Sequence, residues 1–408
     1  MLSLGRTRAR SLLAMLWSVV LAAAMLAATP AQADDIVPSE RVKSSVVVRR
    51  DPIGRPSPPV GSLRPGDRAT LVESVPYFWK VRLANGVEGY VSKSWTMRAA
   101  DEASLLEAAK PLQIHFIDVG QGDATLILCP NGTSILADAG STSGRSPDEI
   151  REYLLHQIED RGGDIDHLIV SHPDADHYNL VREVLDEVPI GRSWYVGERK
   201  DYADAEVFDW IVATPERQKK LEPTYFDAQL RPNPDIDCGA AKLWVLAAAI
   251  EHPSSRKNAM SIVVMIRYGD FEAVVTGDAT KATEDMILSR YPASWLDIDV
   301  LRVGHHGSLA TSTSKRWADT LSPVAAIFSA GYDNSYGHPR GEVVDRLTPH
   351  TGNVAAHAFR EWRDNSGEGA RYLVTDVAGV TEAVYATAVN RTIVVTTTGT
   401  GFTTTHGD

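Results

Sequence analysis

Short apolar runs that end in polar or ionisable residues recur along the chain from about Pro111 onward. Leu168-Ile169-Val170 precedes a segment rich in histidine and aspartate, Ala273-Val274-Val275 precedes Thr276-Gly277-Asp278, and Val300-Leu301-Arg302-Val303 precedes Gly304-His305-His306. Apolar runs of this length between turn residues are typical of buried strands. Because ligand sites form where the ends of neighbouring strands meet, we expect these polar segments to converge on one edge of the fold.

Helical patterns alternate with these predicted strands. Ser146-Pro147-Asp148-Glu149 combines an N-cap residue, a proline at the first helical position and a capping-box acid. Ile150, Leu154 and Ile158 then lie on one face of the helix that follows. Strands, interspersed helices and further strands predict a layered α/β domain over 111–405.

A shorter region, 37–98, has only strand-like patterns. Val46–Arg49, Trp79–Leu83 and Gly89–Val91 are rich in β-prone residues, and Asn85-Gly86 is a hairpin signal because both positions accept a positive φ. The region predicts a small all-β barrel. The Ala/Glu/Leu-rich stretch 99–110 predicts a helical linker between this barrel and the α/β domain.

The first 33 residues have the pattern of an export signal. Three arginines among the first ten residues precede the apolar run Leu12–Ala28, and Ala31-Gln32-Ala33 follows it. These features predict a secretory signal peptide at 1–33 with cleavage after Ala33, and an uncleaved anchor is the alternative. No later stretch is apolar enough to cross a membrane. We therefore expect a soluble protein that is exported to the periplasm or the exterior.

The charge of the chain constrains its partners. The formal net charge is −12, and removal of the three arginines of the signal would change it to −15. An acidic protein repels polyanions at long range, so a nucleic-acid substrate would need local positive charge, which bound metals can supply. The composition therefore argues against tight nonspecific DNA binding.

Cys129 and Cys238 are the only cysteines. A disulfide and two buried free thiols are equally compatible with an exported protein. Neither cysteine belongs to a C-x-x-C pair, which argues against a cysteine zinc site.

The segment 171–177 places four metal-competent side chains within six positions: His172, Asp174, Asp176 and His177. Carboxylates and imidazoles crowded at the end of a buried strand are tolerable mainly around a cation, because burial penalises each charge. The segment therefore predicts a metal site.

Five ordered motifs carry a resemblance to a known family. They are Phe116-Ile117-Asp118-Val119-Gly120-Gln121-Gly122-Asp123, His172-x-Asp174-x-Asp176-His177, Thr276-Gly277-Asp278, His305-His306-Gly307-Ser308 and Tyr336-Gly337-His338-Pro339. This set resembles the metallo-β-lactamase-fold domain of the ComEC DNA-uptake competence proteins over 111–405. The resemblance implies an αββα sandwich with a metal centre at one edge and hydrolytic chemistry. The membrane-channel region of those proteins has no counterpart here, so DNA transport is not implied.

Region 37–98 resembles a bacterial SH3-like domain. The similarity lies in Leu63-Arg64-Pro65-Gly66-Asp67, Trp79-Lys80-Val81 and Gly89-Tyr90-Val91-Ser92. By this resemblance, the domain binds cell-wall peptides or docks onto a neighbouring domain.

The resemblance also implies roles for individual residues. His172 and Asp174 are expected to bind one metal, Asp176 and His177 a second, with Asp278 bridging them. Asp174 stands where the usual His-x-His-x-Asp-His motif has histidine, which shifts the preference from zinc toward manganese. The fold would have a further metal-binding histidine between Asp176 and Asp278, where the candidates are His252 and Asn258. The site is therefore expected to hold one or two ions.

His305, His306 and His338 are expected to complete coordination, protonate the leaving group or stabilise charge, and Asp176 joins them in catalysis. Neighbouring side chains on an extended backbone point to opposite sides. Unless Gly304 and Gly307 bend the chain, we therefore expect His305 to face the metal edge as a ligand or an acid and His306 to support it from behind. The residues expected to contact substrate are Ser308, Asn334 and Tyr336.

These features predict an exported hydrolase that uses a metal-activated water, most simply on phosphodiester bonds of nucleic acid or nucleotides. A lactone, a β-lactam or another acyl substrate is the first alternative. A cell-envelope binding module with a vestigial metal site is the second. The aromatic-rich segment Gly191–Asp237 is expected to cover the site and influence specificity, and surface packing alone is the alternative.

Overall fold

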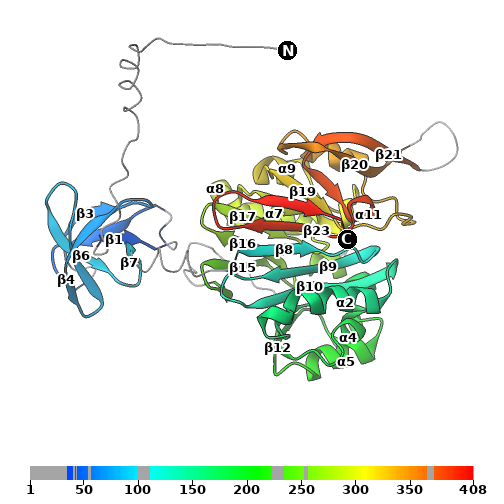
Figure 1. The fold of residues 1–408 in the computed structure, drawn as a ribbon, viewed down its shortest axis with the longest axis horizontal. Helices are drawn as coiled ribbons and strands as arrows, with labels where there is room; N and C mark the ends of the chain where they lie inside the picture. The colour runs from blue at the N-terminus through cyan, green and yellow to red at the C-terminus, as the bar shows by residue number, and fades with distance from the viewer. Residues whose placement is uncertain are drawn as a thin grey trace, which may run out of the picture. The chain divides into compact units, whose positions relative to one another are not determined.

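The computed structural model describes residues 35–39, 42, 44–53, 57–99, 111–222, 234–251, 256–364 and 372–407 (Figure 1). The chain forms two compact units, residues 1–104 and 105–408. The predicted signal peptide at 1–33 and almost all of the predicted linker lie outside the described residues. Within the described ranges, no helix is long and apolar enough to cross a membrane.

The first unit is a small all-β domain. Its strands are β1 (Asp35–Pro38), β2 (Val46–Arg49), β3 (Pro59–Leu63), β4 (Ala69–Val75), β5 (Phe78–Arg82), β6 (Glu88–Ser92) and β7 (Thr96–Arg98), in the sheet order β3-β2-β6-β5-β4-β1-β7. Strands β5 and β6 pair antiparallel and Gly86 has a φ of +82°, so the predicted Asn85-Gly86 hairpin is confirmed. Ile36, Val48, Val81 and Val91 form part of its core. The resemblance to SH3-like domains stays a prediction.

The second unit contains two large mixed sheets. The first has the order β13-β12-β11-β10-β9-β8-β23-β24 and the second β14-β15-β16-β17-β18-β19-β22. The strands of the first sheet are β8 (Leu112–Phe116), β9 (Gln121–Leu128), β10 (Ser134–Ser143), β11 (Ile165–Ile169), β12 (Ile190–Tyr195), β13 (Arg217–Lys220), β23 (Ile393–Thr397) and β24 (Thr403–His406). Those of the second are β14 (Ile236–Cys238), β15 (Ala241–Ala247), β16 (Val263–Tyr268), β17 (Phe271–Val275), β18 (Val300–Arg302), β19 (Ala325–Phe328) and β22 (Val384–Ala386). A hairpin of β20 (Asn353–Asp364) and β21 (Tyr372–Glu382) forms a separate two-stranded sheet.

Helices cover the outer face of each sheet. Against the first sheet pack α2 (Pro147–Ile158), α4 (Val181–Val184) and α5 (Ala205–Ala213), as Figure 1 shows. Against the second pack α7 (Lys281–Arg290), α8 (Ala293–Leu296), α9 (Lys315–Leu321) and α10 (Gly341–Leu347). The short helices are α3 (Ala175–Tyr178), α6 (Arg256–Ala259) and α11 (Thr387–Asn390).

Alternating side chains on the strands create three layers of apolar packing. In β16, Val264 and Ile266 contribute to the core between the two sheets, whereas Val263 and Met265 pack with the helices. This alternation follows from the two-residue period of a strand. The predicted αββα sandwich is confirmed.

A disulfide joins the two sheets. Cys129, which follows β9, is bonded to Cys238 at the end of β14, with 5.0 Å between their Cα atoms. Both residues are buried in the core between the sheets. Of the two arrangements that the sequence left open, the structure contains the disulfide.

The described part of the aromatic-rich segment 191–237 does not line the cavity of the candidate site. Its described part supplies β12, α5 and β13, which extend the first sheet and its helical layer. Trp194, Tyr195 and Tyr202 are buried in the apolar cores. These aromatic residues fill core positions between charged surface positions, so in the described part packing explains the pattern. Residues 223–233 lie outside the described part.

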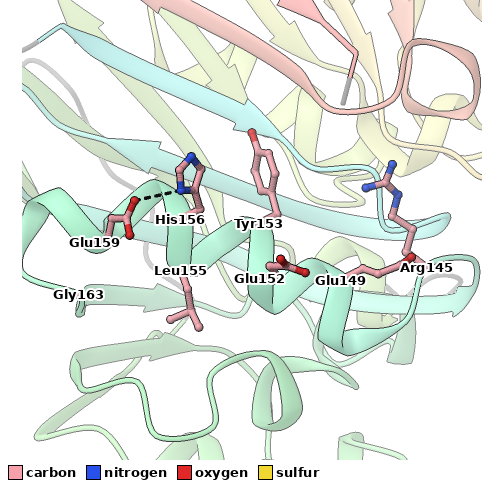
Figure 2. Close-up of a pocket in the computed structure, with 8 residues that line it drawn as sticks. All are labelled: Arg145, Glu149, Glu152, Tyr153, Leu155, His156, Glu159 and Gly163. Atoms are coloured by element: carbon pink, nitrogen blue, oxygen red, sulfur yellow. Dashed lines mark ion pairs between the residues drawn. The ribbon is translucent and has the colours of Figure 1, made fainter.

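Helix α2 begins as predicted. The Ser146 hydroxyl accepts from the Glu149 amide and the Glu149 carboxylate accepts from the Ser146 amide, which forms the capping box. Ile150, Leu154 and Ile158 are buried, as expected. The opposite, acidic face of α2 lines a shallow groove of about 650 Å³ (Figure 2). Tyr153 points from α2 toward the sheet, and its hydroxyl lies 2.8 Å from Nδ1 of His115 on β8.

His115 makes stability depend on pH. It is 2% exposed, and burial together with the nearby charge of Arg161 lowers its pKa to about 4. The unfolded chain, with a pKa near 6.5, therefore takes up this proton first as the pH falls. The contribution of neutral His115 to the free energy of unfolding is complete above about pH 6.5 and is lost as the pH falls toward 4. Between pH 7 and 5 we expect the loss of about 2 kcal/mol from this residue.

Urea unfolding at both pH values tests this expectation. The His115→Gln variant should show a free energy of unfolding that falls less between pH 7 and 5 than in the wild type, by about the same 2 kcal/mol. Equal pH dependence in the two proteins would contradict the assignment.

Candidate metal centre

The metal-binding residue types follow strands of both sheets at one edge of the sandwich. Residues 172–177 come after β11 and enter α3, Asp278 follows β17, and His305 and His306 follow β18. Strand β11 pairs in parallel with β10. Strand β18 pairs in parallel with β17 on one side and with β19 on the other. Gly140 in β10 allows α3 to approach, because a Cβ there would lie 2.4 Å from the carbonyl carbon of Asp176.

The side chains converge on Asp278. Its carboxylate lies 3.2 Å from Nε2 of His177, 3.6 Å from Nε2 of His306 and 3.9 Å from Nε2 of His172. Asp176 Oδ2 lies 3.3 Å from His306 Nε2, and Asp174 Oδ2 lies 3.6 Å from His172 Nε2. Two of the groups able to hold a metal overlap here: His172, His177 and Asp278, and Asp176, His177 and His306.

Three histidines are held through Nδ1 and turn Nε2 toward this centre. Nδ1 of His177 lies 2.8 Å from a carboxylate oxygen of Asp138, and Nδ1 of His306 lies 2.7 Å from the carbonyl oxygen of Ser329. Both partners only accept, so Nδ1 carries the proton. Nδ1 of His172 lies 3.0 Å from Ser171 Oγ, whose hydroxyl donates to Asp138 at 2.6 Å. Burial opposes charge on His177 and His306, but the neighbouring carboxylates of Asp278, Asp138 and Asp176 outweigh it and raise the pKa of both rings. A metal would therefore bind Nε2 by displacing a proton.

The residues fit a divalent cation. Nε2 of His172, His177 and His306 and Oδ1 of Asp278 are buried and have no hydrogen-bond partner among the described residues. Leaving such atoms unsatisfied is costly, and a cation coordinated by nitrogen and oxygen satisfies them together. Burial opposes the ionisation of Asp278, but the charges of His306, His177 and His305 outweigh it and hold its pKa well below the usual value. The carboxylate is therefore ionised at neutral pH.

His305 and His306 differ from the expected arrangement. Their φ angles are +47° and +53°, so the backbone turns sharply and both rings face the centre instead of alternating. The prediction that His306 lies behind His305 is wrong, because His306 is the more buried of the two and belongs to the metal-binding group. His305 belongs to none of the groups of described residues that could hold a metal ion.

The contacts of His305 suit a proton donor. Its Nδ1 lies 2.6 Å from Thr311 Oγ1 and 3.1 Å from Asn258 Nδ2. Both groups can donate to Nδ1, which places the proton of the neutral ring on Nε2, 3.6 Å from Asp278 Oδ2. Asn258, a candidate ligand from the sequence, thus contacts His305 instead. His252, the other candidate, lies outside the described residues.

A cavity of about 320 Å³ opens above the centre. It is lined by Gln121, Thr142, Asp174, Ala175, Asp176, Asp278, His305, His306, Tyr336 and His338. Tyr336 is 56% exposed at the rim, and its ring stacks at 17° on that of His338. Burial, with the charges of His306 and His305, lowers the pKa of His338 to about 3, so this ring is neutral at neutral pH.

Two of the three predicted substrate-binding residues do not line this cavity. Asn334 is buried and donates from Nδ2 to the carbonyls of Gly331 and His338, while its Oδ1 accepts from the His338 amide. Its side chain therefore shapes the loop that carries His338. Ser308 is also buried, and its amide donates to the carbonyl of His305. The predicted contacts of Ser308 and Asn334 with substrate stay predictions, and in the structure both residues are buried outside the cavity lining.

Three charged residues of the site were missed from the sequence. Asp138 supports His177 and Ser171, and Arg302 pairs with Asp123 at 2.8 Å beneath the centre. Lys257 Nζ lies 3.3 Å from Asp174. Asp138 follows a predicted strand, as the other site residues do, and this position was the available signal. Arg302 stands inside an apolar run and Lys257 in a polar segment, so neither had a local signal.

Comparison with known proteins identifies the family of the second unit. Residues 117–327 match the metallo-beta-lactamase superfamily. The chain is 28% identical over 255 residues to ComE operon protein 3 of Bacillus subtilis (strain 168), covering 59% of this chain and 31% of that protein. It is 32% identical over 250 residues to Recombination protein 2 of Haemophilus influenzae, covering 59% and 27%. Among solved structures, a mutant of the CmlA beta-hydroxylase is similar with a TM-score of 0.37 and 14% identity, covering 59% of this chain and 50% of that one.

This chain belongs to the metallo-beta-lactamase superfamily. Its curated relatives include ComE operon protein 3, Recombination protein 2 and the Competence protein ComA of Neisseria gonorrhoeae. The chain spans under a third of the length of these curated relatives.

Proposed function

We propose that the protein is an exported, metal-dependent hydrolase of phosphodiester bonds in nucleic acid or nucleotides. The observation that carries the proposal is the set of three buried Nε2 atoms around the Asp278 carboxylate at the floor of a cavity. The names of the relatives, which include Recombination protein 2 and Competence protein ComA, point to nucleic acid as the substrate class. Superfamily membership supports hydrolysis as the reaction class.

His172, His177, Asp278, Asp176 and His306 would hold one or two divalent ions, zinc or manganese. Such an ion, when bound, lowers the pKa of water and polarises the ester. The residues at the rim act on the substrate itself. His305, with its proton on Nε2, is placed to donate to the leaving oxygen. Tyr336 and His338 form a stacked aromatic wall on which a planar group such as a nucleobase can pack.

Local positive charge at the site makes a nucleic-acid substrate compatible with an acidic chain. Lys257 stands beside Asp174 at the centre, and bound cations add further positive charge. Export rests on the pattern of residues 1–33. Cell-wall contact through residues 37–98 rests on their resemblance to SH3-like domains. N-terminal sequencing of the protein from the exported fraction should give Asp34, and a sequence beginning at Met1 would contradict cleavage.

The reaction is tested with the purified full chain after zinc or manganese reconstitution. The substrates are single-stranded DNA, a chromogenic bis-aryl phosphodiester and a β-lactam, and the Asp278→Ala variant is the control. We expect metal-dependent cleavage of DNA and the diester that the control lacks. Cleavage of the β-lactam alone would show an acyl hydrolase. Tight metal binding without turnover of any substrate would favour the binding-module alternative.

A further inference from the structure

Arg302 is a fully buried cation beneath the metal centre. It ends β18 in the second sheet and is 0% exposed. Its Nη2 lies 2.8 Å from the carboxylate of Asp123, which is in β9 of the first sheet and is 1% exposed. A buried guanidinium needs such a partner, because burial of an isolated charge is very unfavourable.

Most of the remaining contacts of Arg302 lead to the predicted metal-binding residues. Nη1 donates to the carbonyl of Gly277 at 2.5 Å and to that of Val303 at 3.1 Å. The Gly277 carbonyl immediately precedes Asp278, and Nη1 lies 3.7 Å from Asp278 Oδ1. Arg302 thus holds the turn that presents the carboxylate on which the centre converges.

Arg302 also approaches the ring of His306. Its Nη2 lies 3.4 Å from His306 Nδ1, the atom that donates to the Ser329 carbonyl. A guanidinium only donates, so this contact is electrostatic and not a hydrogen bond. Arg302 therefore lies beside the Nδ1 edge of the ring, and the ring itself lines the cavity.

We propose that Arg302 is a positioning residue of the metal centre, which orients Asp278 and His306 toward the cavity before any metal binds. The inference rests on the metal centre of the proposed function. It adds that metal affinity depends on a side chain that does not itself coordinate the ion. The competing explanation is that Arg302 and Asp123 serve only as an ion pair between the two sheets.

The double variant Asp123→Leu/Arg302→Met separates these explanations. It removes both charges and leaves neither one unpaired, so the protein can keep its stability. The hydrogen bond to Gly277 and the charge beside His306 are nevertheless lost. We expect a thermal midpoint within a few degrees of the wild type and zinc binding weaker by about 10- to 100-fold. Zinc affinity is measured on the metal-free full chain by competition with a chromogenic chelator.

A conservative single variant and a matched control complete the design. Arg302→Lys keeps the charge but cannot reach Asp123 and both carbonyls in the same fork, so we expect zinc binding weakened by about tenfold. The control is Arg267→Met/Glu272→Leu, which removes an ion pair between β16 and β17 at the end of β17 away from Asp278. Its zinc affinity should equal that of the wild type.

Wild-type zinc affinity in both Arg302 variants would overturn the proposal. A loss of zinc affinity seen only in variants that are also unfolded would overturn it as well. Because the readout needs no substrate, failure of the phosphodiesterase assay with normal zinc binding would count against the proposed function alone.

Discussion

Replacing His306 with alanine is expected to remove bound metal and to lower turnover of the bis-aryl phosphodiester by about 10³-fold. His306 places Nε2 3.3 Å from Asp176 and 3.6 Å from Asp278, and its Nδ1 is held by the Ser329 carbonyl. Among the described residues, the metal-binding group that contains Asp176 has two histidines, His177 and His306. Metal content by elemental analysis and initial rates on the same preparation measure the two effects.

His305→Ala is the matched comparison, because the neighbouring imidazole faces the same cavity. Nδ1 of His305 lies near Thr311 and Asn258, and in the proposed function His305 donates a proton to the leaving group and does not bind the metal. We expect full metal content and a rate lower by about 10²-fold, the usual contribution of a general acid. Equal loss of metal in both variants would show that His305 and His306 are equivalent ligands.

Replacing both Cys129 and Cys238 with alanine is expected to lower the free energy of unfolding by about 2 to 4 kcal/mol. The disulfide joins residues separated by 109 positions and connects strands of different sheets, so it restricts the unfolded chain strongly. Urea unfolding of the wild type and the double variant measures the difference.

The metal centre provides an internal control for the disulfide variant. Cys129 follows the end of β9, whereas Gln121 at the start of β9 lines the cavity. Zinc affinity should therefore be unchanged in the double variant. A midpoint of unfolding that is insensitive both to the substitutions and to a reductant would contradict the stabilising role.

Much of the fold could be predicted from local sequence because strand and helix signals are local. The apolar runs before Asp278 and before His305 are strands that end at the site, and the capping box starts α2 where expected. The sandwich itself followed from a resemblance across five ordered motifs.

Features that depend on tertiary contacts could not be predicted in this way. The orientation of His305 and His306 depends on left-handed backbone angles at both residues. The flanking glycines made such a bend conceivable from the sequence, but only the folded structure determines it. The role of Asn334 depends on contacts with Gly331 and His338, and that of Arg302 on a partner 179 positions earlier in the sequence. Aromatic residues in a charged segment suggested a surface element, yet Trp194 and Tyr202 fill the interior.

The disulfide and the metal centre lie at opposite ends of β9, and both connect the same two sheets. A metal bound by His177 and Asp278 would thus be a second link between the two sheets, at the end of β9 away from the disulfide. The two links are far apart along one strand, so each would restrain a different end of the interface between the sheets.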